Sequence, residues 1–308
     1  MCYYAASSEL AVKFIFLLMF AEEKLSIIFL ALYFITYYFA NKHTIPILKL
    51  LANWCRWFSF AFFFSYLLVI FELSSRPDWV HFIIGIGLWF ILETLFFRIS
   101  VQILNSSEVP LFPKYQRDSI DNLWPINNRA LKIKDYLLNE SFENIGVIKA
   151  ELMKGFSIRQ SLFLAKTKEV RVNVVFIPNA KNEIKCYFSL FSINNSGAYL
   201  ITDNLNIPFG GFYPDHWSIN RYPLCQSLAK LLKKHIKKMK ASGLNWEVLD
   251  TDLLNKVNHC QMELEHINQK MGFFSYSEEE AKARITSEGS NRICLEMWLL
   301  SYLGKTFH

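Results

Sequence analysis

The chain has 308 residues, of which 52% are apolar and 16% aromatic, and only 19% are charged, against about a quarter in typical soluble proteins. This composition excludes a disordered chain and is too apolar for an ordinary soluble domain. The charges are unevenly distributed: residues 1–104 hold 7 Lys and Arg and 6 Asp and Glu, whereas residues 105–308 hold 26 and 21. The sequence therefore predicts an α-helical membrane domain over residues 1–104, followed by a water-soluble part.

Three apolar runs in the first hundred residues predict membrane spans. Leu25–Ala40 and Trp57–Phe71 contain no charged residue, and Trp79–Phe97 contains one, Glu93. A helix that crosses a bilayer needs about 17–25 mostly apolar residues, and flanking Trp and Tyr side chains extend the first two runs to that length. We therefore predict three transmembrane helices in a multi-pass membrane protein.

The residues before these runs leave two interpretations open. Leu10–Ala21 is apolar except for Lys13, but twelve residues are few for a span, and three charged residues separate the segment from the next run. It is either an interfacial helix or the end of a fourth span that starts near Tyr3. In a fourth span, Glu9 and Lys13 would lie on one face of the helix and partly neutralise each other.

The basic residues of the loops predict the orientation. The connection between the first two runs carries Lys42, Lys49 and Arg56 without an acid, whereas the short link 72–78 carries one basic and two acidic residues. Cytoplasmic loops are enriched in Lys and Arg. We therefore place residues 41–56 and everything after the third run in the cytoplasm, with the protein in the cell membrane.

Glu93 is an ionisable residue inside a predicted span, where such groups need a partner. It precedes Arg98 by five residues, near the predicted cytoplasmic end of its helix. We expect it to pair with Arg56 or Arg98 at the level of the headgroups.

The water-soluble part begins with a predicted linker over residues 105–126, which contain three prolines and many Ser, Asn and Asp,. In residues 169–178, Val and Phe alternate with Arg171 and Asn173, as in a half-buried strand with one face in water. Similar runs, separated by turn residues, predict further strands. The expected strands are 142–151, 157–165, 169–178, 183–192 and 198–204.

Helical patterns flank these strands. The expected helices are 129–138, Pro223 to 241, 251–271, a short helix opened by a capping box Ser277–Glu280, and 292–303,. No helix separates the strands, which excludes a doubly wound parallel sheet. Residues 127–308 are therefore predicted to form an α+β domain with an antiparallel meander sheet flanked by helices.

One predicted helix, residues 224–240, has a basic face. Its apolar residues fall on one side and lysines on the other,. A tethered lysine face attracts anionic headgroups of the adjacent leaflet, and we favour this partner over nucleic acid because no aromatic interleaving accompanies the lysines. An ordinary solvated helix face is the other interpretation. The lysines are Lys230, Lys233, Lys234, Lys237, Lys238 and Lys240.

The loop 206–217 is the candidate for chemistry. It combines aromatic residues, the pair Gly210-Gly211, and the neighbouring Asp215 and His216. Such a loop forms a ligand pocket or places His216 for general acid–base catalysis. The competing interpretation is structural, with the glycines turning the chain and the aromatic residues capping the sheet.

The predicted helix 251–271 has two stripes. His259, Glu263 and His266 share one face, but a single Glu-x-x-His motif is half of what a di-iron site needs, so we predict no metal. The opposite stripe has coiled-coil spacing, which favours packing on the domain's own sheet and leaves a homodimer seam as the alternative. The seam residues are Leu253, Val257, Leu264 and Ile267.

The six cysteines show no C-x-x-C spacing, which indicates reduced thiols,. No motif specifies a cofactor, and we expect none.

The leading hypothesis is a multi-pass membrane protein whose cytoplasmic domain binds or scaffolds at the inner leaflet. The alternative is a membrane-tethered enzyme with its site in the 206–217 loop.

Overall fold

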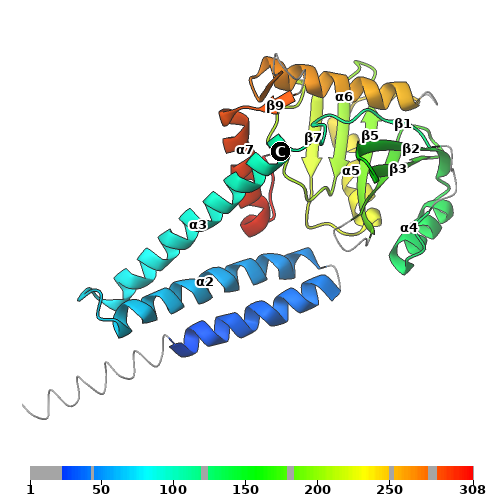
Figure 1. Cartoon of the computed structure of the whole chain (residues 1–308). Helices are drawn as coiled ribbons and strands as arrows, with labels where there is room; N and C mark the ends of the chain where they lie inside the picture. The colour runs from blue at the N-terminus through cyan, green and yellow to red at the C-terminus, as the bar shows by residue number, and fades with distance from the viewer. Residues whose placement is uncertain are drawn as a thin grey trace, which may run out of the picture. The chain divides into compact units, whose positions relative to one another are not determined.

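The computed structural model describes residues 23–42, 45–118, 124–178, 184–249, 253–276 and 283–307 (Figure 1). The chain divides into two compact units. The helical unit is Met1–Ile99 with Ser301–Gly304, and the sheet domain is Ser100–Leu300 with Lys305–His308. The segment Leu10–Ala21, with its two interpretations, lies outside the described residues.

Three helices of the described chain are long and apolar enough to cross a membrane: Glu23–Lys42, α2 (Pro46–Ile70) and α3 (Asp78–Ser106). The three predicted spans are thereby confirmed in length and composition. Pro46 lies in the first turn of α2, where its fixed φ suits a helix and its missing N–H is no loss.

Small residues bring these helices together. The Ser26 and Ser59 hydroxyls each donate to the other residue's carbonyl oxygen, at 3.1 and 3.0 Å. A Cβ atom at Gly85 would lie 3.0 Å from the Cα atom of Ala61. Helices in lipid depend on such close approach and on hydrogen bonds, because burial of apolar surface gives no driving force there.

Glu93 has the partner that the sequence predicted. Arg56 Nη2 lies 2.7 Å from Glu93 Oε1, and the Arg56 guanidinium lies 5.1 Å from the centroid of the Trp89 ring. The pair neutralises a buried carboxylate, which is the requirement for an acid inside an apolar helix.

The end of the chain returns to the helical unit. After α7 (Ser287–Trp298), the π-helical turn Leu299–Leu303 presents two carbonyl groups to α2. Asn53 donates to the Ser301 carbonyl at 2.8 Å, and Trp54 Nε1 donates to the Tyr302 carbonyl at 2.9 Å. The predicted helix 292–303 is therefore two elements, α7 in the sheet domain and a π-helical turn whose last three residues belong to the helical unit.

The sheet domain contains a seven-stranded sheet in the order β1 to β7 (Figure 1). The five predicted strands are present, with ends within two residues of those expected. The strands are β1 (Gln116–Arg117), β2 (Glu143–Met153), β3 (Phe156–Leu164), β4 (Arg171–Pro178), β5 (Ile184–Ile193), β6 (Tyr199–Asp203) and β7 (Trp217–Arg221).

The sheet is not a pure meander. The first six strands pair antiparallel, but β7 pairs parallel to β6, with Tyr199 opposite Trp217. Parallel neighbours need a crossover, which the loop 204–216 supplies. In addition, β1 forms within the predicted linker 105–126. Its two residues, Gln116 and Arg117, therefore belong to the sheet and not to a linker.

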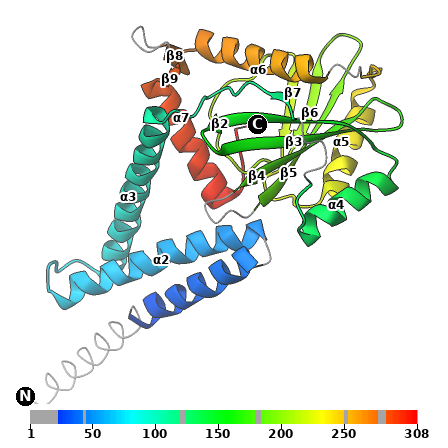
Figure 2. The same cartoon turned by 45° about the vertical axis from the view of Figure 1, so that its right-hand side comes forward.

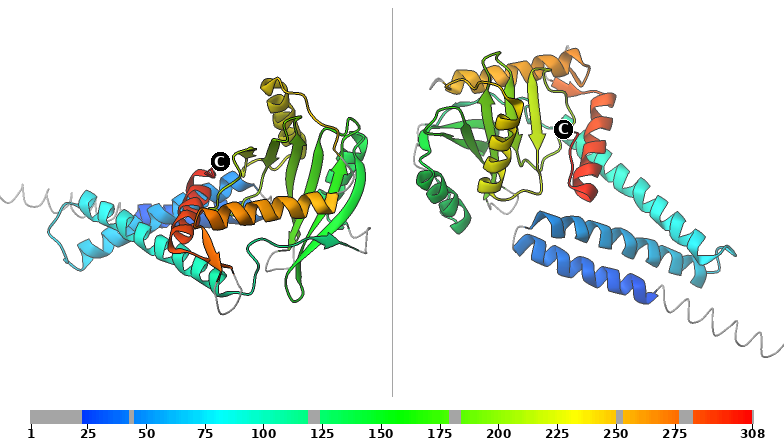
Figure 3. Two further views of the ribbon diagram at one scale, coloured as in Figure 1. Left: turned by 90° about the horizontal axis from the view of Figure 1, so that it is seen from above. Right: turned by 180° about the vertical axis from the view of Figure 1, so that it is seen from behind.

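Both faces of the sheet are covered, which corrects the expectation of a water-exposed face. Helices α4 (Asn128–Asn139) and α5 (Leu228–Ser242) pack on the side of Val172 and Val174, forming the main core. Helix α6 (Leu253–Lys270) packs on the opposite side (Figures 2 and 3). The side chains expected in water, Arg171 and Asn173, are 4% and 3% exposed.

The segment after α6 also differs from the prediction. A short helix from Ser277 was expected, but residues 277–282 lie outside the described residues. The residues on either side form an antiparallel hairpin, β8 (Phe274–Tyr276) and β9 (Ala283–Ile285).

Candidate functional site

Helix α5 has the two faces that its sequence predicted. Ser227 caps the first turn by accepting from the Lys230 N–H, and Gly243 ends the helix with a φ of 63°. Leu228, Leu231 and Met239 are buried against the sheet. All six lysines of the opposite face are exposed: Lys230, Lys233, Lys234, Lys237, Lys238 and Lys240.

Two of these lysines make contacts within the domain. Lys234 Nζ lies 3.7 Å from the centroid of the Tyr222 ring, and the Lys238 ammonium donates to the Asn220 side chain. Helix α5 carries no acidic residue, so its outer face is uniformly positive.

His235 lies on the buried face of α5 and is 0% exposed. Its Nδ1 lies 2.8 Å from Thr202 Oγ1 and its Nε2 lies 3.0 Å from Ser192 Oγ. Burial lowers the pKa of His235 to about 4. The imidazole is therefore a neutral hydrogen-bonding bridge between α5 and the sheet.

The catalytic candidates of the 206–217 loop, Asp215 and His216, are both exposed. His216 Nε2 accepts a hydrogen bond from Trp217 Nε1 at 3.0 Å and lies 3.8 Å from Glu263 Oε1. Neither residue lines the cavity between the sheet and α6, but both line a separate surface pocket of about 510 Å³.

The rest of this loop is fixed by a buried charge network. Arg221 donates to Glu296 at 2.8 Å and to the carbonyls of Leu205 and Ile207 at 3.0 and 2.9 Å, and Asp203 lies 3.4 Å from its Nε. The other Glu296 oxygen accepts from the backbone N–H groups of Phe209 and Gly210.

Glycine and asparagine complete the fixation of the loop. Gly210 has a φ of +68°, and a Cβ there would lie 2.7 Å from the backbone nitrogen of Ile293, so only glycine fits. Asn268 of α6 accepts from the Phe212 N–H at 2.7 Å and donates to the Phe212 carbonyl at 2.8 Å. The glycines thus turn the chain, as the structural interpretation expected.

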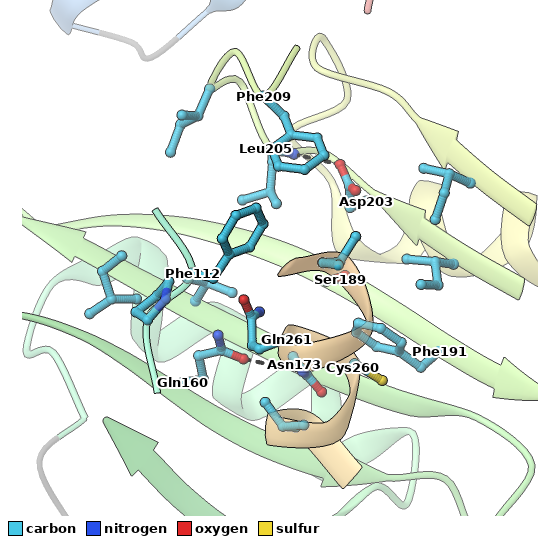
Figure 4. A pocket seen from close by; sticks show the side chains of 18 of the residues that line it. Phe112, Gln160, Asn173, Ser189, Phe191, Asp203, Leu205, Phe209, Cys260 and Gln261 are labelled. Carbon is cyan, nitrogen blue, oxygen red and sulfur yellow. Dashed lines mark hydrogen bonds between the residues drawn. The ribbon is translucent and has the colours of Figure 1, made fainter. Parts of the chain in front are cut away.

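The fixed loop closes one side of a cavity of about 380 Å³ between the sheet and α6 (Figure 4). Most lining residues are apolar or aromatic, among them Phe112, Phe191 and Phe209. The strands β3 to β7 add polar residues to the same wall. These are Gln160, Arg171, Asn173, Ser189, Asp203 and Arg221.

Hydrogen bonds satisfy part of this polar wall. Gln160 Nε2 donates to Tyr115 Oη at 2.7 Å. Asn173 Nδ2 donates to Gln160 Oε1 at 3.2 Å (Figure 4). Arg171 Nε and Asn173 Oδ1 are buried without a hydrogen-bond partner among the described residues. Buried polar groups in native proteins are nearly always paired, so these two stand out.

The two stripes of α6 have different surroundings. His259 and His266 are exposed, and in the described ranges no three metal-ligating side chains gather at one point. Val257 and Cys260 of the other stripe are 6% and 7% exposed, because they pack against the domain's own sheet.

The packing of this stripe on the domain's own sheet agrees with the interpretation that the sequence favoured. Val257 and Leu264 contribute to the sheet-facing packing, Ile267 is half-buried, and Leu253 begins the helix. Val257 and Leu264 also line the cavity. The homodimer seam over Leu253, Val257, Leu264 and Ile267 stays a prediction.

Sequence reasoning missed Arg171, Asn173 and Gln160 as site residues. Their alternation with apolar residues in β3 and β4 is also typical of a sheet face in water, and the side chains that cover them come from distant segments.

The five described cysteines, Cys55, Cys186, Cys225, Cys260 and Cys294, are free thiols. The sequence matches no family model, no curated protein and no solved structure.

Proposed function

We propose that this protein is a membrane-anchored binding protein. Its apolar helices hold the chain in the cell membrane, and the sheet domain lies on the cytoplasmic side, where α5 binds anionic headgroups of the inner leaflet. The observation that carries the proposal is the outer face of α5, on which six exposed lysines have no acidic neighbour within the helix.

Physical chemistry supports this role for the lysine face. The cytoplasmic leaflet has a negative surface potential that attracts basic segments held within a Debye length, about 8 Å at physiological salt. Helix α5 is packed on the core by Leu231 and His235, so its lysines are presented together on a fixed backbone. The basic loop between the first two spans favours the same side of the membrane.

Charge reversal on α5 tests the proposal. Lys230, Lys233 and Lys237 lie on one stripe, so we expect their joint replacement by Glu to lower the anionic lipid that copurifies with the full-length chain. After extraction in mild detergent, lipid mass spectrometry should show at least a threefold loss of anionic relative to zwitterionic lipid, because attraction becomes repulsion.

A second triple variant provides the matched control. Lys132, Lys154 and Lys185 are exposed on α4, the β2–β3 turn and β5, so their replacement by Glu changes the net charge equally at scattered sites. The control should keep the lipid ratio of the unmodified chain. An α5 variant that retains as much anionic lipid as the control would refute the lysine face as the binding surface.

The alternative function is a tethered enzyme that uses Asp215 and His216. Both side chains are exposed, and they line a surface pocket of about 510 Å³ rather than the cavity between the sheet and α6. A general base must reach the proton that it removes, either directly or through one water molecule.

A further inference from the structure

Arg171 is a buried cation of the sheet domain that has no carboxylate beside it among the described residues. Its side chain is buried to 4% exposure, and no carboxylate in the described part of the chain lies within 4 Å of its guanidinium. Arg221, on the same cavity wall, is in contrast held between Asp203 and Glu296. Arg221 thus has two carboxylates beside it, whereas Arg171 has none in the described ranges.

The Arg171 guanidinium has a buried donor without a partner in the described part of the chain. Its guanidinium lies 4.6 Å from the centroid of the Phe191 ring, within the range of a cation–π contact. Its Nε has no hydrogen-bond partner among the described residues, and neither has the nearby carbonyl oxygen Asn173 Oδ1. Isolated buried charges are costly, and burial lowers the pKa of Arg171.

Arginine presents a fork of donors that matches a carboxylate in two parallel hydrogen bonds. One guanidinium neutralises one negative charge, which selects a monoanion over a phosphate monoester carrying about −1.5 to −2. The free Asn173 oxygen would accept from a hydroxyl or amide group close to the carboxylate.

The other lining residues determine the polarity and the size of the rest of the ligand. Ile158, Val175 and Phe191 come from the sheet, Phe112 from the segment before β1, and Leu264 from α6. A volume of about 380 Å³ equals that of roughly a dozen water molecules at about 30 Å³ each, enough for a similar number of non-hydrogen atoms.

We infer that the sheet domain binds an amphiphilic monocarboxylate of about a dozen non-hydrogen atoms, with its carboxylate on Arg171 and its apolar body between the sheet and α6. This site is separate from the lysine face of α5, because the two lie on opposite sides of the sheet. It does not depend on the headgroup binding proposed above.

Octanoate is a probe of suitable size, and binding of its radiolabelled form to the full-length chain in neutral lipid nanodiscs tests the inference. We expect one saturable site per chain above the uptake of empty nanodiscs. Octanamide and octyl phosphate should compete at least tenfold less well, because the first lacks the charge and the second carries too much.

The variant Arg171→Met should lose at least tenfold in octanoate affinity, since a charge-assisted hydrogen bond is removed. The matched control Arg117→Met changes an exposed arginine of β1 and should bind as the unmodified chain does. Methionine fills similar space, and removing an unpaired buried charge should leave the melting temperature of Arg171→Met equal or higher. If Arg171 served only to hold the fold, this variant would melt lower.

Three results overturn the inference. They are the absence of saturable octanoate uptake up to 1 mM, equal affinity in Arg171→Met and the unmodified chain, and tighter binding of octyl phosphate or octanamide than of octanoate. The first and second remove the site, and the third removes the monocarboxylate as its ligand.

Discussion

Replacing Arg221 with methionine is expected to lower the free energy of unfolding of the sheet domain by about 3–5 kcal/mol, the cost of breaking a buried ion pair from one side. Arg221 is 8% exposed and lies between Asp203 and Glu296, which are 5% and 1% exposed. Without the guanidinium, two buried carboxylates lose their counter-charge and two loop carbonyls lose their donor.

Hydrogen exchange of the full-length chain in detergent measures this effect locally. Peptides from β6 and β7 should exchange at least a hundredfold faster in Arg221→Met, because local opening is governed by the same free energy. Arg117→Met, at an exposed position of β1, should change exchange less than threefold. Similar exchange in both variants would show that the network contributes nothing to stability.

Rescue distinguishes lost charge balance from lost packing. If uncompensated carboxylates cause the defect, adding Asp203→Asn and Glu296→Gln to Arg221→Met should restore a large part of the protection. Neutral amides of the same shape remove the desolvation cost of the two charges. A triple variant less protected than Arg221→Met would assign the effect to packing.

Acidification is expected to destabilise the sheet domain through His235 by about 3 kcal/mol between pH 6.5 and pH 4. Burial lowers the pKa of His235 to about 4, whereas an unfolded histidine has a pKa near 6.5. Between these values the unfolded chain binds the proton and the folded chain does not. The contribution of His235 to stability is therefore fully present above pH 6.5 and is lost as the pH decreases toward 4.

Asp203 contributes with the opposite sign. Burial raises its pKa from 3.8 to about 6, against the lowering effect of Arg221. In that window the folded chain binds the proton more tightly, so this residue stabilises the fold as the pH decreases. The pH dependence of the unmodified chain is thus a difference of two terms, and a variant is needed to isolate His235.

The variant His235→Asn keeps a donor and an acceptor between Thr202 and Ser192 but does not titrate. Its melting temperature, subtracted from that of the unmodified chain at each pH from 7 to 4, cancels the contribution of Asp203. We expect the difference to shift steadily against the unmodified chain below pH 6.5. A difference that is constant with pH would contradict a neutral buried His235.

The elements that local periodicity determines could be predicted from the sequence. The three apolar helices, the amphipathic α5 and the five strands from β2 to β6 all follow from the spacing of apolar residues over one element. Strand β7 could not be predicted, because its five residues pair in parallel with β6 across a long loop. The contacts around it are also distant along the chain, as between Arg221 at the end of β7 and Glu296, 75 positions away.

The cavity shows the same limit. Arg171 and Asn173 alternate with valines, and this pattern alone predicts a water-exposed face. They are buried because α6 and the segment around Phe112 cover that face. The sequence of β4 alone does not indicate that segments so distant along the chain pack on it. An arginine in an apolar strand without a facing acid is the only hint that the sequence offers.

The most direct test of the account is the sidedness of the membrane, because a lysine face binds the inner leaflet only from the cytoplasm. Ser75, between α2 and α3, and Ala229, on α5, are both exposed and are each replaced by cysteine in the full-length chain. A membrane-impermeant maleimide applied to intact cells should label Ser75→Cys but not Ala229→Cys, and both after permeabilisation, with the unmodified chain as the background for its own thiols. Labelling of Ala229→Cys in intact cells, with Ser75→Cys protected, would place the sheet domain outside and contradict the proposed function.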